Sequence, residues 1–196
     1  MTTPFESVTE ADMLAFAAQY PLAWVVPVTT PSAAILMPVL VESEQGQPTA
    51  LLGHLPRRSE ANAAFQQDTA AVVLFLGPNA YIPPGWLSQP HWAPTWNFVS
   101  LKVEAEISPS PDLARPAIEQ LAQHMEKGQE TPWNTAELGG RYETLLQHVT
   151  GFRAPITALH PRFKTGQDET ARSWAEIRAA LGDHPLAQWM SEPGAR

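Results

Sequence analysis

Apolar and polar residues alternate with period two over much of the chain, which is typical of strands with one buried face. In the segment 96–107 the odd positions from Val99 to Ala105 are apolar, and the even positions from Phe98 to Glu104 lie on the opposite face. Similar runs, bounded by turn residues, predict six strands. The predicted strands are Leu22–Thr29, Ala33–Glu42, Thr49–Leu55, Ala70–Leu76, Trp96–Ile107 and Phe152–Leu159.

Segments whose apolar residues recur at helical spacing lie before, between and after these runs. Thr9 and Asp12 are placed as a capping box before a short amphipathic helix that ends near Tyr20. Ser59 is placed to cap a second helix, and Gly151 is expected to end a helix that precedes the last strand. The other predicted helices cover a stripe from Leu113 to Met125, then Arg141–Val149, Thr170–Leu181 and Pro185–Met190. Short strands with inserted helices favour a small antiparallel barrel, although the pattern alone leaves a sandwich and an α+β sheet open.

Length and composition bound the picture further. The 196 residues suit one domain, with a helical insertion at about 111–149 and C-terminal helices at about 170–190. A net charge of −8 disfavours direct DNA binding, because attraction to a phosphate backbone needs positive charge. The chain has no cysteine, no basic leader followed by an apolar core, and no apolar run of the roughly 20 residues that a membrane helix needs. A cytoplasmic protein without a membrane anchor is expected.

A junction between a strand and a helix offers the best anion site. The segment from Gly53 to Ser59 places His54, Arg57 and Ser59 together, and forked guanidinium donors beside free N–H groups suit a phosphate. The alternative is that the arginines are solvated and that Ser59 is only a cap. His54 is expected to position a ligand. The histidines show no HExxH or HxH spacing, so no metal site is expected.

The segment 74–98 contains five prolines and a set of large rings, so it is built to hold its shape. We expect it to form either the wall of a pocket or a surface that binds a partner. The rings are Phe75, Tyr81, Trp86, Trp92, Trp96 and Phe98.

The residue pattern of this segment resembles that of the PaiB-like family. These are small flavin-nucleotide-binding proteins, often called FMN-binding negative transcriptional regulators. The resemblance rests on Phe75-x-Gly77-Pro78-x-Ala80-Tyr81-Ile82-x-Pro84-x-Trp86 and Pro94-Thr95-Trp96-Asn97-Phe98. Further matches are Gly53-His54-Leu55-x-Arg57, Pro132-Trp133, Val149-x-Gly151-Phe152 and Phe163-Lys164 with Gln167. The chain departs from the family's usual residues at Leu36, Ser59, Asn62, Gly166 and Asp168.

The resemblance implies the split β-barrel of FMN-binding proteins, FMN as the cofactor, and a homodimer with two flavin sites at its interface. It favours Arg57 for the phosphate. Trp96 and Asn97 would offer the flavin a stacking plate and an amide, and Lys164 a cation near the phosphate or the reduced ring. Trp86, Trp92 and Trp96 could equally fill a dimer interface. The implied cofactor-binding residues are His54, Arg57, Ser59, Tyr81, Trp86, Thr95, Trp96, Asn97, Lys164 and Gln167.

Three functions stay open at this point. The first is a flavin-binding protein with the negative regulatory role that the family name implies. The second is an FMN-dependent oxidoreductase that acts on a small molecule, for which no catalytic residue is assigned. The third is an interaction module that has lost its flavin. The absence of GxSxG, Walker A and GxGxxG motifs removes the usual support for a hydrolase, a P-loop NTPase or a nicotinamide enzyme. Glu176 is expected to face solvent.

Overall fold

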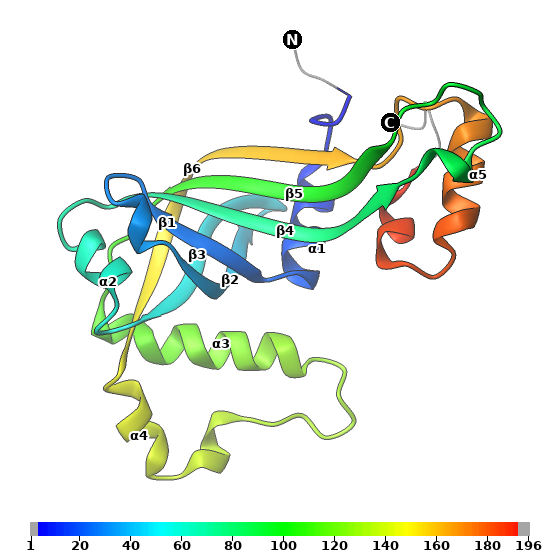
Figure 1. Ribbon diagram of the computed structural model, residues 1–196. Coiled ribbons are helices and arrows are strands. Elements are labelled where there is room, and N and C mark those ends of the chain that lie inside the picture. Colours follow the sequence, from blue (N-terminus) through cyan, green and yellow to red (C-terminus); the bar gives the residue numbers. More distant parts are fainter. Residues whose placement is uncertain (1–3, 192–196) are drawn as a thin grey trace.

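The computed structural model describes residues 4–191, and over that range six antiparallel strands close into a barrel in the order β1-β2-β3-β6-β5-β4. The strands are β1 (Leu22–Pro27), β2 (Ile35–Glu44), β3 (Gln47–Pro56), β4 (Ala70–Ile82), β5 (Thr95–Glu106) and β6 (Val149–Lys164). The first three form an antiparallel meander. Closure leaves no free edge along the sheet, and the predicted barrel is confirmed (Figure 1).

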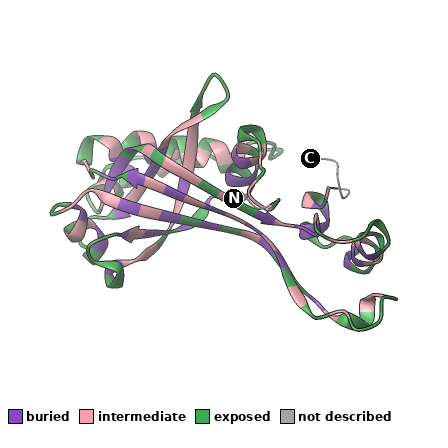
Figure 2. Ribbon diagram, turned by 90° about the horizontal axis from the view of Figure 1, so that it is seen from above, coloured by how far each residue is buried: buried purple, intermediate pink, exposed green. Residues whose placement is uncertain are grey.

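Alternation along the strands fills the barrel with side chains. In β5 the residues Val99, Leu101, Val103 and Ala105 are at most 3% exposed, whereas the residues between them are partly exposed, which confirms the predicted faces. The largest fully buried side chains line the same interior and include Phe16, Phe75, Phe152, Phe163, Leu51 and Leu55. Figure 2 shows the buried stripes running along the strands and the exposed surface concentrating on helices and loops. The interior is therefore a packed core.

Helices cover the ends and one side of the barrel (Figure 1). They are α1 (Glu10–Gln19), α2 (Glu60–Phe65), α3 (Ala114–Glu126), α4 (Arg141–Leu146) and α5 (Ala171–Leu181), with 3-10 turns η1 (Pro31–Ala33), η2 (Pro84–Trp86), η3 (Pro111–Leu113), η4 (Thr135–Leu138) and η5 (Pro185–Trp189). The predicted capping box is present, since Thr9 Oγ1 accepts from Asp12 N at 3.1 Å and Asp12 Oδ2 accepts from Thr9 N at 3.4 Å. Within the described residues no helix combines the length and apolar character that crossing a membrane requires.

Three strands, β3, β4 and β6, are longer than the pattern predicts. β4 continues past a bulge between Leu76 and Asn79 to Ile82, so the irregular loop shrinks to residues 83–94. The sequence pattern stops at this bulge because one extra residue breaks the alternation. Figure 1 shows the ends of β4 and β5 running past the barrel to α5. The hairpin thereby carries its aromatic residues away from α2, which lies at the other end of the barrel.

The prediction that Gly151 ends a helix is wrong. α4 ends at Leu146, and Gly151 lies inside β6, where it pairs with His54 and bridges to Ser110. A Cβ atom built on Gly151 would lie 2.0 Å from the carbonyl oxygen of Leu113. The residue is a glycine because the start of the α3 region passes directly over the strand.

Candidate functional site

The residues that the sequence nominates fall into two groups at opposite ends of the barrel. His54, Arg57 and Ser59 lie beside α2, and the other seven lie near α5 (Figure 1). β6 runs between the groups: its Gly151 pairs with His54, and its Lys164 pairs with Phe98. At about 3.3 Å per residue these two positions are roughly 40 Å apart along the strand. In one chain the two groups therefore lie far apart, at opposite ends of the barrel (Figure 1).

The end beside α2 is the predicted phosphate junction. Arg57 is exposed, and its Nη2 donates to the carbonyl oxygen of Val149 at 3.4 Å. Ser59 is a helix cap, because its Oγ accepts from Asn62 N at 3.1 Å and donates to Pro56 O at 2.8 Å. Asn62 ties the turn further by donating to Arg57 O at 2.9 Å. The turn is ordered by its own contacts, and the guanidinium keeps donors for another acceptor.

His54 lies on β3 next to this turn. Its Nδ1 is buried and has no hydrogen-bond partner among the described residues. Burial lowers the pKa of its imidazole, because a charged ring loses its hydration there. His54 is thus a neutral group at most physiological pH values, which suits ligand positioning better than binding an anion by charge.

The end beside α5 presents an aromatic pair on the outer face of the barrel. Tyr81 and Trp96 are direct partners between β4 and β5, with ring centroids 5.9 Å apart, and they are 48% and 54% exposed. Lys164 lies on the adjacent strand and donates from Nζ to Thr95 Oγ1. Within residues 4–191 no carboxylate forms a salt bridge with Lys164. Two exposed rings therefore share one surface, and Lys164, which pairs with Phe98 on the same face of the sheet, lies beside it with its ammonium group turned to Thr95.

Asn97 and Gln167 do not join that surface. Asn97 is 2% exposed and faces the other side of β5 from Trp96, because neighbouring residues of a strand point to opposite faces. Its Nδ2 is buried without a partner among the described residues. Gln167 uses its amide within the chain: its Oε1 accepts from Thr165 N at 2.7 Å, and its Nε2 donates to Phe163 O. Flavin contacts by these two residues stay predictions.

The predicted tryptophan cluster is only partly exposed. Trp86 and Trp92 pack against the hydrophobic core, and Trp92 Nε1 donates to Glu169 Oε2 at 3.2 Å. Trp96 is the exposed member. Glu176 is partly exposed, and its carboxylate also accepts from Ser88 N at 2.9 Å and from Ser88 Oγ at 2.5 Å. The loop 83–94 is therefore fastened to α5 and to the core.

An apolar patch on the outer face was not recognised from the sequence. Trp24 on β1 is flanked by Leu36 on β2 and Leu74 on β4, its direct partners across the sheet. These side chains point away from the barrel interior and are 40–49% exposed. Leu22 and Leu76, at 53% and 61%, extend the patch along the same strands. The sequence did contain a signal for this patch, because both the odd and the even positions of β1 and β4 are apolar. A strand with one face in solvent would carry polar residues on that face.

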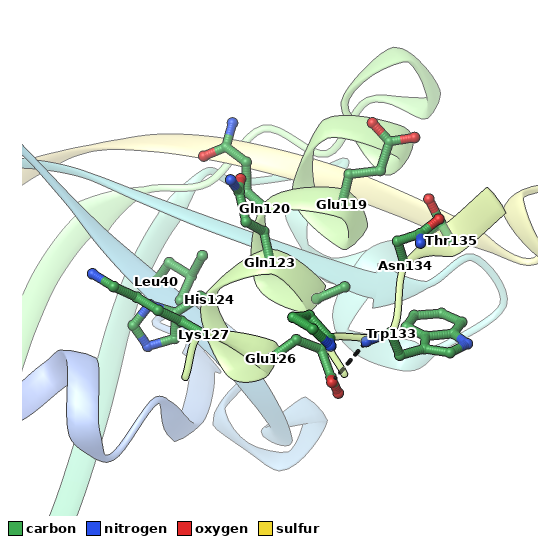
Figure 3. A pocket seen from close by; sticks show the side chains of 12 residues that line it. Leu40, Glu119, Gln120, Gln123, His124, Glu126, Lys127, Trp133, Asn134 and Thr135 are labelled. Carbon is green, nitrogen blue, oxygen red and sulfur yellow. Dashed lines mark hydrogen bonds between the residues drawn. The ribbon is translucent and has the colours of Figure 1, made fainter. Parts of the chain in front are cut away.

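A separate cleft of about 1160 Å³ lies in the helical insertion (Figure 3). It is formed by α3 and the segment that returns from it, and Trp133 closes one side. Its polar groups serve the fold: within the insertion Glu126 Oε2 accepts from Trp133 N at 3.0 Å, and the His124 ring joins the insertion to α1 by contacting the carbonyl oxygen of Ala18 at 2.7 Å. This cleft is remote from the aromatic pair, so the outer face of β4, β5 and β6 is the better candidate for the site.

The barrel and its outer aromatic face define a small split-barrel protein of the flavin-binding kind. Residues 1–158 match the family described as "Putative FMN-binding domain", and the chain belongs to that family. Its cofactor is FMN.

Comparisons with individual proteins agree on the fold. The chain is 24% identical over 173 residues to "Protease synthase and sporulation protein PAI 2" of Bacillus subtilis (strain 168), a match that covers 78% of this chain and 83% of the relative. It superposes on the FAD and heme binding protein of Mycobacterium smegmatis with a TM-score of 0.59 at 15% identity, over 81% of this chain and 72% of the other. The conserved hypothetical protein Rv2991 of Mycobacterium tuberculosis gives a TM-score of 0.55 at 8% identity, over 84% and 90% of the two chains. The likeness to the two structures establishes the barrel fold.

Proposed function

We propose that the protein is a cytoplasmic, homodimeric FMN-binding protein with a role in the negative regulation of transcription. The observation that carries the binding part is the exposed Tyr81 and Trp96 pair beside Lys164. Exposed rings offer flat apolar surface to the isoalloxazine, and a cation beside them favours the negative charge of a reduced flavin ring or of its phosphate. Bound FMN would supply electron-accepting chemistry, and these side chains would hold and orient it.

The proposed dimer follows from the apolar patch of Leu22, Trp24, Leu36, Leu74 and Leu76. Contiguous apolar surface of this kind usually marks an interface, and a second copy of the chain is the occupant that we propose. The patch lies between the α2 end and the α5 end of the barrel. A two-fold axis through it would bring the α2 end of one copy toward the α5 end of the other. The two nominated groups, which one chain keeps apart, would then meet across the interface.

The regulatory part rests on two supports. The relative in Bacillus subtilis is named a protease synthase and sporulation protein, and the resemblance to the PaiB-like family implies negative regulation. The net charge of −8 argues that such regulation works through a partner or through the flavin and not through direct contact with DNA. An FMN-dependent oxidoreductase uses the same surface, and steady consumption of a nicotinamide donor by the loaded protein would favour that function.

The test combines light scattering with FMN titration. Trp96→Ala removes one ring of the aromatic pair, and we expect it to weaken both FMN binding and dimerisation. Trp24→Glu places a charge in the centre of the apolar patch, and we expect it to yield monomers. Met125→Glu is the matched control, because Met125 is 53% exposed on α3 and lies outside the patch.

Three results would contradict the proposal. A wild-type protein without flavin absorbance, before and after FMN is added, would support the interaction module that has lost its flavin. A wild-type monomer at micromolar concentration that binds FMN normally would exclude the shared interface. A Trp96→Ala protein that keeps both properties would show that Trp96 has no part in either.

A further inference from the structure

The cleft in the helical insertion is shaped for an extended ligand. It has a volume of about 1160 Å³, and most of the residues that line it are exposed (Figure 3). Pockets that enclose a small molecule usually measure about 300–1,000 Å³ and bury most of it. The stretch of α3 from Glu119 to Glu126 is roughly 10 Å long, which is the length of about three residues of extended chain. A short polypeptide segment therefore fits this cleft better than a compact cofactor.

The cleft is acidic where it faces Trp133. Glu126 Oε2 accepts from Trp133 N at 3.0 Å, and no cation among the described residues forms a salt bridge with Glu126. The side chain of Lys127, the next residue, extends away from Trp133 (Figure 3). The insertion 111–149 contains six acidic and three basic residues, so its net charge is −3. This field attracts a cationic group to the Glu126 carboxylate.

The ring of Trp133 narrows the choice of cation. It is 37% exposed, and a guanidinium stacks on such a ring while it pairs with a carboxylate beside it. The insertion already contains one group of this kind, because Arg115 lies 4.9 Å from the centre of the Tyr142 ring and its Nη2 contacts Glu143 Oε1 at 2.5 Å. The cleft offers the ring and the carboxylate of a second such group without its arginine. An arginine from another molecule would complete it.

The wall formed by α3 suits a peptide backbone. Gln120 and Gln123 line the cleft, are exposed, and have no hydrogen bond with any described residue. A side-chain amide both donates and accepts, so it can pair with the N–H and C=O groups of an extended chain. The wall is held in place beforehand, by the capping box of Asn134 and Glu137 and by the 2.7 Å contact of the His124 ring with α1. A preformed surface lowers the entropy cost of binding.

We propose that this cleft binds an extended basic segment of a partner protein. An arginine of that segment lies between Trp133 and Glu126, and its backbone follows Gln120 and Gln123 along α3. The inference depends neither on flavin binding nor on dimerisation. It provides a docking place for the partner through which an acidic protein could regulate transcription without contacting DNA.

The experiment measures fluorescence anisotropy of a labelled peptide in which arginine and alanine alternate. The proteins are the wild type, Glu126→Gln, Trp133→Leu and Asp183→Asn. Asp183 is a matched control for the loss of one negative charge, because it is exposed in the turn between α5 and η5, at the other end of the molecule (Figure 1). Glu126→Gln keeps an oxygen for Trp133 N, so the cleft should retain its shape.

We expect Glu126→Gln to weaken the peptide roughly 10-fold, as for loss of a hydrogen bond between charged groups, and Trp133→Leu roughly fivefold. Trp133→Phe keeps a ring and should recover part of that loss. Asp183→Asn should change the affinity less than about twofold, since a distant exposed charge is screened. A peptide in which glutamate replaces arginine should not bind.

Four results would overturn the proposal. The first is a wild type that does not bind the arginine peptide at millimolar concentration, or that binds the glutamate peptide equally well. The second is an equal effect of Glu126→Gln and Asp183→Asn, which would show only diffuse attraction to an acidic protein. The third is displacement of the peptide by arginine amide at the same concentration, which would identify a site for a small organic cation. The fourth is unchanged affinity in Gln123→Ala, a variant that keeps the ring and the carboxylate and for which we expect a roughly threefold loss.

Folding and flavin binding are followed separately. If Glu126→Gln unfolds at a lower urea concentration than the wild type, Gln123→Ala and Trp133→Phe decide the outcome in its place. Peptide binding by a wild type that binds no FMN would leave this inference standing and would contradict the proposed function.

Discussion

Substitution of Gly151 by alanine tests the close approach that anchors the helical insertion. The new Cβ would lie 2.0 Å from Leu113 O and 2.6 Å from Ala114 N, and these backbone atoms cannot rotate away as a side chain would. Relief requires that the start of α3 move away from β6. That movement would break the two hydrogen bonds between Ser110 and Gly151, whose N to O distances are 2.8 and 3.0 Å.

The expected loss of stability can be worked from these contacts. Overpacking costs about 1–3 kcal/mol, and two hydrogen bonds contribute about 0.5–1.5 kcal/mol each, so the free energy of unfolding should fall by roughly 2–6 kcal/mol. A small domain has only about 5–15 kcal/mol in total. Urea unfolding followed by tryptophan fluorescence measures the change.

Gly140→Ala is the matched control for this measurement. Gly140 has a right-handed helical conformation, with φ of −62°, and its Cβ would have nothing within 4 Å. Alanine there should leave stability unchanged or raise it by about 0.4–1 kcal/mol. If Gly151→Ala behaves like Gly140→Ala, with a change below about 1 kcal/mol, the reasoning from the close approach is refuted.

Two further predictions concern pH and DNA. Burial lowers the folded-state pKa of His54, so the unfolded chain binds its proton first as pH falls through about 6.5, and stability should decline from there until the folded form also takes the proton. His54→Gln should flatten the dependence of the urea midpoint on pH between 5 and 7. The control His148→Gln changes an exposed residue and should leave the His54 contribution in place. An unchanged slope in His54→Gln would contradict the burial argument. With a net charge of −8, the isolated protein should form no sequence-specific complex at physiological salt in a mobility-shift assay. A discrete band with one promoter that survives excess competitor DNA would overturn that expectation.

Runs of apolar and β-branched residues between turn signals were enough to predict the six strands, with clear alternation in β5 and nearly continuous apolar residues in β1 and β4. Element ends were harder to predict. β4 extends through Tyr81 because the chain resumes pairing after a bulge, and neither the bulge nor the partner strand is visible in local pattern. β6 extends to Lys164 for the same kind of reason: its outer residues are polar, and only pairing with β5 keeps them extended. Long-range pairing thus decided what local propensity could not.

Candidate residues could be nominated from the sequence, but their grouping could not. The junction of Arg57 and Ser59 and the pair of Trp96 and Asn97 are each contiguous in the chain, and contiguity suggested one site. Contiguity is a poor guide on a strand, because the side chains of Trp96 and Asn97 leave it on opposite faces.

The residues that share a face with Trp96 are those two, four and six positions away on β5 and their partners on β4 and β6. Reading the register in this way joins Tyr81, Lys164, Ser100 and Arg162 into one surface, although they are widely separated in sequence. The same reading places Arg57 at the opposite end of the barrel from this surface. If Arg57 binds the phosphate while Trp96 stacks on the ring, each flavin is divided between two copies, and flavin affinity must then fall with dissociation of the dimer.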